Sequence, residues 1–201
     1  MDRISTPNFI MMKPIQWIAL LACIAGCEAK PQGSATPSNP SPPSAASAVT
    51  PVDLQILDFE GIQQLIASKK GKVVVVDAWS TSCPPCMKEF PKLVALHKKH
   101  KPEDLACISL SFDYEGIGTP AATKPKVLDF LSSQGATFDN VLSSDESDAL
   151  YRKLNLASVP AVFVYDRDGK LVKRFDNEKA ASEAEAFTYQ QVGELVEQLR
   201  K

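Results

Sequence analysis

The sequence predicts a single α/β domain over residues 52–201, in which helices cover both faces of a β-sheet. The run "KVVVVDAW" at 72–79 is rich in β-branched residues, as in a strand buried on both faces of a parallel sheet. Segments with helical periodicity alternate with this strand and with further strands. The last two strands form a hairpin around the turn "DRDG", and an amphipathic segment follows them.

The expected elements follow one another in a regular order. Residues 53–71 begin with a short strand-like alternation and continue as a helix in which Ile62, Leu65 and Ile66 share a face. Pro120 and the glycines before it are assigned to a loop. The remaining predicted elements are strand 72–79, helix 84–100, strand 105–112, helix 125–134, strand 138–142, helix 146–154, strands 161–165 and 170–175, and helix 189–200.

The overall charge excludes one class of partner. The chain has 201 residues, 44% of them apolar, and a formal net charge of -2. Proteins that bind nucleic acid usually carry a basic patch or stripe. No such stripe with interleaved aromatic residues is present in this sequence. We therefore expect no nucleic-acid partner.

The first 26 residues predict an export signal. Arg3 and Lys13 supply positive charge before an apolar run at 15–26. This run is too short to span a bilayer comfortably but has the size of a signal-peptide core. It ends in "IAGC", which resembles the lipobox of bacterial lipoproteins. The resemblance implies that residues 1–26 are removed and that Cys27 is lipidated, whereas the alternative is an ordinary signal peptide with an incidental cysteine.

The segment 27–51 is predicted to be a tether between a lipidated Cys27 and the domain at 52–201. Six of the 24 residues from 28 to 51 are proline and none is aromatic. Such a composition buries too little apolar surface to offset the entropy of ordering. Proline also favours extended geometry, so the segment is expected to hold the domain away from a membrane surface.

A pair of cysteines lies where the strand at 72–79 gives way to a helix, in the sequence "CPPC". Cys83 is expected at the N-cap, with Pro84 and Pro85 in the first helical turn, where an N–H group has no partner within the helix. Cys86 is then one turn along, on the same side as Cys83. A disulfide between them would constrain little of the unfolded chain, so we predict that it serves reversible chemistry.

The helix N-terminus suits Cys83 to be the attacking thiol, because its partial positive charge stabilises a thiolate. Two prolines remove amides that could bond the sulfur, which leaves the amide of Cys86 as the expected donor. Cys83 would attack a partner disulfide, and the more buried Cys86 would then attack Cys83 and release the reduced partner. Cys107 lies within an apolar strand and is expected to be a core residue.

The segment "DAWSTSCPPCMKEFP" resembles the active-site segment of the thioredoxin superfamily, and the exported setting resembles its TlpA/ResA-like membrane-anchored branch. The resemblance covers residues 52–201. It implies a thioredoxin-like fold, with a central mixed β-sheet flanked by helices and an inserted helix and strand around 125–142. It also implies that Pro91 kinks the active-site helix and that Pro160, in "SVPAVFV", is a cis-proline facing the disulfide.

The same resemblance implies how a partner would be held. In the family a tryptophan four residues before the first cysteine lies beside the disulfide, and Trp79 matches it, although a packing role is the alternative. Val159 would offer backbone groups to an extended partner strand, next to Pro160. Pro84 and Pro85 complete the predicted substrate-binding set, whereas neither a cofactor nor a metal is expected.

Asp77 lies six residues before Cys83, where thioredoxins carry a buried acid, although many members of the exported branch have another residue there. Burial is expected to raise the pKa of a carboxyl at this position. Asp77 is therefore a candidate base for Cys86 during partner release. The alternative is an acid that caps the loop after the strand.

The predicted function is an extracytoplasmic thiol-disulfide oxidoreductase on a bacterial membrane, facing the periplasm or extracytoplasmic space. Its partners would be protein thiols and disulfides, such as apocytochrome c, and an upstream membrane electron donor. The branch favours disulfide reduction, in a role such as cytochrome c maturation. A disulfide-forming oxidase or isomerase is the alternative, and a thiolate metal carrier is a weaker one. The paired cysteines disfavour a peroxidase or a non-catalytic adaptor.

Overall fold

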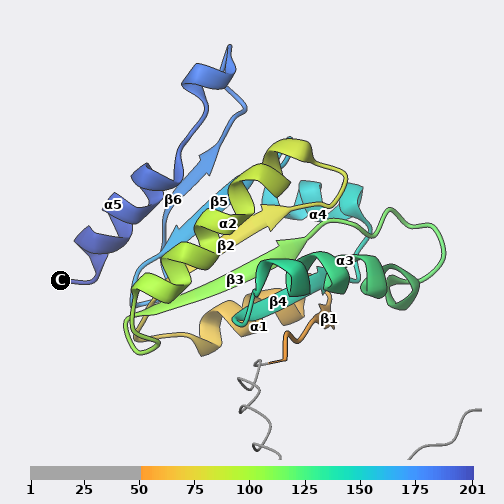
Figure 1. Ribbon diagram of the computed structural model, residues 1–201, viewed down its shortest axis with the longest axis horizontal. Coiled ribbons are helices and arrows are strands. Elements are labelled where there is room, and N and C mark those ends of the chain that lie inside the picture. The colour runs from red at the N-terminus through yellow and green to blue at the C-terminus, as the bar shows by residue number, and fades with distance from the viewer. Residues whose placement is uncertain (1–50) are drawn as a thin grey trace, which may run out of the picture. The chain divides into compact units, whose positions relative to one another are not determined.

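The computed structural model describes residues 51–201 (Figure 1). The predicted signal peptide at 1–26, the predicted lipidation site Cys27 and the tether before Pro51 lie outside the described residues. Within residues 51–201, none of the helices combines the length and apolarity needed to cross a bilayer. The elements, in chain order, are β1 Gln55–Leu57, α1 Phe59–Ser68, β2 Val73–Trp79, α2 Pro84–Lys99, β3 Leu105–Ser111, α3 Pro120–Gln134, β4 Asp139–Ser143, α4 Ser147–Leu154, β5 Ala161–Tyr165, β6 Leu171–Asp176, the short 3-10 helix η1 Glu183–Glu185 and α5 Tyr189–Leu199.

Six strands form one mixed sheet, in the order β1-β4-β3-β2-β5-β6. The pairs β1–β4, β4–β3 and β3–β2 are parallel, whereas β5 runs antiparallel to both β2 and β6. This arrangement confirms the predicted α/β, thioredoxin-like fold. β2 lies inside the sheet, with β3 on one side and β5 on the other. The cysteine motif that follows β2 therefore lies above the central strands, at the end of the sheet where β2 terminates.

Alternate side chains of β2 enter two different cores. Val73, Val75 and Trp79 pack with residues of α2, α3 and α5, whereas Val74 and Val76 pack with residues of α1 and α4. Figure 1 shows α2, α3 and α5 on the near face of the sheet and α1 and α4 behind it. All seven residues of β2 are buried, as predicted for a strand covered on both faces.

Helix α3 begins earlier than the sequence analysis predicted. It was expected over 125–134, but it starts at Pro120, and Pro125 lies inside it. Thr119 is the N-cap and its hydroxyl accepts a hydrogen bond from the amide of Ala122 across 3.3 Å. Pro120 at the first helical position loses no helix hydrogen bond, so these two residues form a start signal that Pro125 does not match.

Candidate active site

Cys83 and Cys86 form a disulfide at the N-terminus of α2, with their Cα atoms 5.3 Å apart. Cys83 is the N-cap residue, as predicted, and it is partly exposed. Cys86 lies in the first turn and is only 3% exposed. A partner can therefore reach the sulfur of Cys83 more easily than that of Cys86, in agreement with an attacking and a resolving role.

The amide of Cys86 donates a hydrogen bond to Sγ of Cys83 across 3.2 Å. N-cap side chains normally accept from the amide two or three positions further on. Here the residue two positions on is Pro85, which has no N–H group, so Cys86 supplies the donor. This contact is the one that the sequence analysis expected.

A second segment approaches the disulfide from the start of β5. The peptide bond between Val159 and Pro160 is cis, as the resemblance implied. The carbonyl oxygen of Val159 lies 3.9 Å from Sγ of Cys83. Residues that are 76 positions apart in the sequence therefore meet at the sulfur of the partly exposed Cys83.

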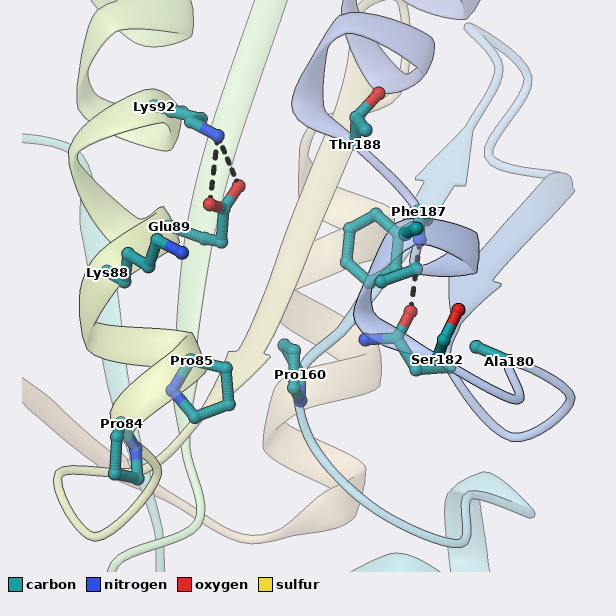
Figure 2. Close-up of a pocket in the computed structure, with 13 residues that line it drawn as sticks. Pro84, Pro85, Lys88, Glu89, Lys92, Pro160, Ala180, Ser182, Phe187 and Thr188 are labelled. Carbon is teal, nitrogen blue, oxygen red and sulfur yellow. Dashed lines mark hydrogen bonds and ion pairs between the residues drawn. The ribbon is translucent and has the colours of Figure 1, made fainter.

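A groove of about 840 Å³ runs beside the disulfide, between α2 and the segment that connects β6 to α5. Figure 2 shows Pro84 and Pro85 on α2, with Pro160 nearby and Phe187 projecting from the opposite wall. An ion pair between Glu89 and Lys92, 2.6 Å apart, lies on the α2 wall. The lining residues are Pro84, Pro85, Lys88, Glu89, Lys92, Pro160, Asn177, Ala180, Ser182, Ala184, Ala186, Phe187 and Thr188.

Asp113 holds the loop that precedes the cysteines. Its side chain, only 2% exposed, accepts hydrogen bonds from the amide of Thr81 at 3.0 Å and from the hydroxyl groups of Ser80 at 3.2 Å and Ser111 at 2.7 Å. The hydroxyl of Thr81 also donates to this carboxylate. The loop after β2 is thereby fixed to the end of β3, which positions Cys83 relative to the sheet.

Asp77 lies in β2 and is 4% exposed. The hydroxyl of Tyr189, in α5, donates a hydrogen bond to its Oδ2 across 2.5 Å. Burial raises the pKa of the Asp77 carboxyl from 3.8 to about 7, while the Tyr189 hydrogen bond lowers it and the negative charge of Glu89 raises it. A raised pKa is what the sequence analysis expected for a buried acid at this position.

Comparisons with known proteins define the family. The family model described as Redoxin matches residues 43–189. The chain belongs to the Redoxin family. "Thiol-disulfide oxidoreductase ResA" of Bacillus thuringiensis is 27% identical to this Redoxin chain over 132 residues, which are 66% of this chain and 70% of that protein. The family and its named relatives identify the chain as a thiol-disulfide oxidoreductase.

Solved structures share the fold of this Redoxin protein. A thiol-disulfide isomerase from Corynebacterium glutamicum superposes with a TM-score of 0.54 at 19% identity, and the match covers 78% of this chain and 99% of that one. A thiol:disulfide interchange protein from Chlorobium tepidum gives a TM-score of 0.51 at 20% identity, covering 67% of this chain and 84% of that one. These likenesses support the thioredoxin-like architecture.

Trp79, predicted to contact a partner, is fully buried in this Redoxin domain. Its ring lies 4.9 Å from that of Phe90 and 4.8 Å from that of Phe130, measured between centroids. A side chain without exposed surface cannot touch a partner in this structure. Trp79 instead packs against Phe90 of the active-site helix. This is the packing role that the sequence analysis gave as the alternative.

Cys107 is not part of the Cys83–Cys86 disulfide. It is a free cysteine, 1% exposed, within β3. Burial, and to a lesser extent the charge of Asp77, raises the pKa of its thiol far above the ordinary value. The thiol is therefore a poor nucleophile, which agrees with the predicted core role.

Two residues of the site were missed from the sequence. Tyr189 is more than a hundred positions from Asp77, and no local motif joins them. The sequence did contain a signal for Asp113. This residue comes after the end of β3, in the same way that the loop at 80–82 comes after the end of β2. The carboxyl ends of neighbouring parallel strands meet at one sheet edge, so polar residues after two such strands are expected to interact.

Proposed function

We propose that this thiol-disulfide oxidoreductase works outside the cytoplasmic membrane and reduces disulfides in partner proteins. The observation that carries the proposal is the unequal burial of the two cysteines at a helix N-terminus, next to a groove lined by Pro84, Pro85 and Pro160. A nucleophile must be accessible, whereas a resolving thiol needs to reach only the first sulfur.

The reaction begins from the reduced protein. The Cys83 thiolate attacks one sulfur of the partner disulfide, a Cys83–partner bond forms, and the other partner sulfur leaves as a thiolate and takes up a proton. Cys86 then passes its proton to Asp77 and attacks Sγ of Cys83. The mixed disulfide breaks, Cys83 and Cys86 become oxidised, and the second partner sulfur leaves and is protonated.

The partner is proposed to lie in the groove as an extended segment. Pro84, Pro85 and Pro160 give the groove an apolar surface beside the disulfide. The backbone of Val159 would pair with the segment on either side of the target cysteine. Such recognition depends mainly on backbone groups, so it admits partners of different sequence.

The cellular role follows from the N-terminal sequence and from the branch that the chain resembles. A signal at 1–26 and a lipidated Cys27 would place the domain on the outer side of a membrane, at the end of the 27–51 tether. An upstream membrane electron donor would return the Cys83–Cys86 disulfide to the dithiol. The relatives named ResA belong to the branch for which the sequence analysis implied cytochrome c maturation, so apocytochrome c is the proposed partner.

Trapping of mixed disulfides in cells tests this function. Cys86→Ser removes the resolving thiol, so we expect partners to stay bonded to Cys83 and to be released by dithiothreitol. Cys83→Ser is the matched control and should retain none. Apocytochrome c among the trapped proteins supports the maturation role, whereas a broad set of folding intermediates contradicts it and favours general disulfide exchange.

The direction of electron flow is tested separately by equilibration with glutathione. A reductase is expected to have a potential close to that of thioredoxin, about -270 mV. A value close to that of the strong oxidant DsbA, about -120 mV, would contradict the reductive role and support the oxidase alternative.

A further inference from the structure

The carboxylate of Asp77 and the phenol of Tyr189 form a buried hydrogen-bonded pair between the sheet and α5. Asp77 is 4% exposed and Tyr189 is 7% exposed. Their oxygen atoms are 2.5 Å apart, at the short end of the range for a hydrogen bond from a hydroxyl to a charged oxygen. Water has little access to either group, so the properties of the acid depend on this contact.

The tyrosine is held in place by the start of its own helix. Thr188 caps α5, and its hydroxyl accepts a hydrogen bond from the amide of Gln191 across 3.4 Å. In return, the side chain of Gln191 accepts one from the amide of Thr188 across 2.9 Å. This capping box fixes the backbone of the first turn, from which the Tyr189 side chain reaches Asp77.

The other titratable groups around Asp77 all oppose its ionisation or are neutral. Glu89, on α2, raises the pKa of Asp77 through its negative charge. Cys107, on β3, interacts with the same carboxylate but stays a neutral thiol. Cys86, in the first turn of α2, is part of the same hydrophobic core as Tyr189. Among the groups that shift the pKa of Asp77, the Tyr189 hydroxyl is the one that favours the charged form.

We propose that Tyr189 is a positioning residue for proton transfer in the release step, because its hydroxyl holds Oδ2 of Asp77 and leaves Oδ1 to receive the proton of Cys86. This inference rests on the proposed role of Asp77 as the base. The S–H bond of Cys86 breaks, its proton moves to Oδ1, and the thiolate attacks Sγ of Cys83, which breaks the Cys83–partner bond and releases the partner sulfur as a thiolate. Tyr189 keeps its own proton throughout, because burial raises the pKa of its phenol well above 10.

The test removes the hydroxyl and keeps the ring. In the full-length chain we compare Tyr189→Phe with Tyr165→Phe, which removes a hydroxyl from a tyrosine packed on the other face of the sheet. The first measurement is the NMR titration of the Asp77 carboxyl in the oxidised protein. Loss of a hydrogen bond to the charged form should raise its midpoint by about one pH unit in Tyr189→Phe. Tyr165→Phe should leave it unchanged.

The second measurement is the rate at which a Cys83 mixed disulfide is resolved, as a function of pH. The same shift should move the midpoint of the rate profile to higher pH. Resolution of the mixed disulfide at pH 7 should slow by roughly fivefold, since fewer Asp77 carboxyls are ionised. In an Asp77→Asn background, Tyr189→Phe should have no further effect. A fluorinated tyrosine at position 189, a stronger donor of nearly the same shape, should shift both midpoints downward.

The outcomes separate this inference from the function on which it rests. An unchanged Asp77 midpoint in Tyr189→Phe overturns the inference, as does a slowing that persists in the Asp77→Asn background. If the midpoint rises while neither Tyr189→Phe nor Asp77→Asn changes the rate profile, Asp77 is not the base and the positioning role falls with it. Trapping of partners by Cys86→Ser would still support the oxidoreductase.

Discussion

Sγ of Cys83 accepts a hydrogen bond from the backbone of Cys86, one helical turn away, across 3.2 Å. Both positions between them are proline, so this amide is the first in the helix that can donate. The thiolate formed on reduction would thus receive one backbone hydrogen bond where an N-cap side chain can receive two. The residues between the cysteines therefore determine which amides can stabilise the Cys83 thiolate.

Pro85→Ala is expected to restore the missing donor. The new amide is two positions after the N-cap and points toward the sulfur, so it should stabilise the thiolate. The pH at which Cys83 is half-reactive toward iodoacetamide should fall by roughly half a unit to one unit. Pro84→Ala is the matched control, because an amide at the first helical position does not reach an N-cap side chain. Equal shifts in the two variants would contradict this explanation.

Asp77→Asn should remove a pH dependence of stability. The carboxyl has a pKa of about 7 in the folded protein and about 4 when unfolded, so between these values the folded state retains a proton that the unfolded state loses. The free energy of unfolding should therefore fall as the pH rises from 4 to 7.

Above pH 7, the oxidised Asp77→Asn protein should be more stable than the unchanged one, by at most about 4 kcal/mol for this shift of pKa. Urea unfolding at pH 5 and pH 8 measures the difference. Asp168→Asn, in the exposed turn of the hairpin, is the control and should not change the slope. A parallel pH dependence in all three proteins would show that Asp77 is not the group responsible.

Asp113→Ala should loosen the loop before the cysteines. The substitution leaves the amide and hydroxyl of Thr81 and the hydroxyl groups of Ser80 and Ser111 without this acceptor. Unsatisfied buried donors cost about 1–3 kcal/mol, so the free energy of unfolding should fall by that order.

Hydrogen exchange at residues 80–83 should also become faster in Asp113→Ala. Asp129→Ala, at an exposed position of α3, is the control and should stay within about 0.5 kcal/mol of the unchanged protein. If both variants lose the same stability, the Asp113 network does not hold the loop.

Cys107 should resist alkylation in the reduced, folded protein. Its thiol is buried and its raised pKa keeps it protonated. Mass spectrometry of peptides after iodoacetamide treatment should show that Cys83 is modified roughly a hundredfold faster than Cys107, since the thiolate is the reactive form. Cys107 should react at a comparable rate only in denaturant. Equal labelling without denaturant would indicate that β3 opens readily.

The parts of the structure that could be predicted from the sequence are those that depend on neighbouring residues. The N-cap position of Cys83 and its bond from Cys86 follow from a strand, two prolines and helix geometry. The start of α3 depends on equally local signals, the cap at Thr119 and the proline after it, which the predicted start at Pro125 missed. Pro125 lies inside the helix, at an exposed position.

Contacts between distant elements could not be predicted in the same way. Tyr189 reaches Asp77 because α5 packs on the sheet face that carries the acid, and that choice of face is decided by the whole core. The burial of Trp79 likewise depends on Phe130, which reaches it from α3. Hydrophobic periodicity indicates which side of a helix is buried but not which residues it will contact.

The bond between the two sulfurs encloses only Pro84 and Pro85. Opening so small a ring frees almost no chain entropy, so oxidised and reduced forms are expected to share one architecture. The protein can thus be oxidised and reduced without refolding. The free energy of each disulfide exchange is therefore not used to change its conformation. A fold that stays unchanged while its dithiol is oxidised and then reduced again can support many catalytic cycles.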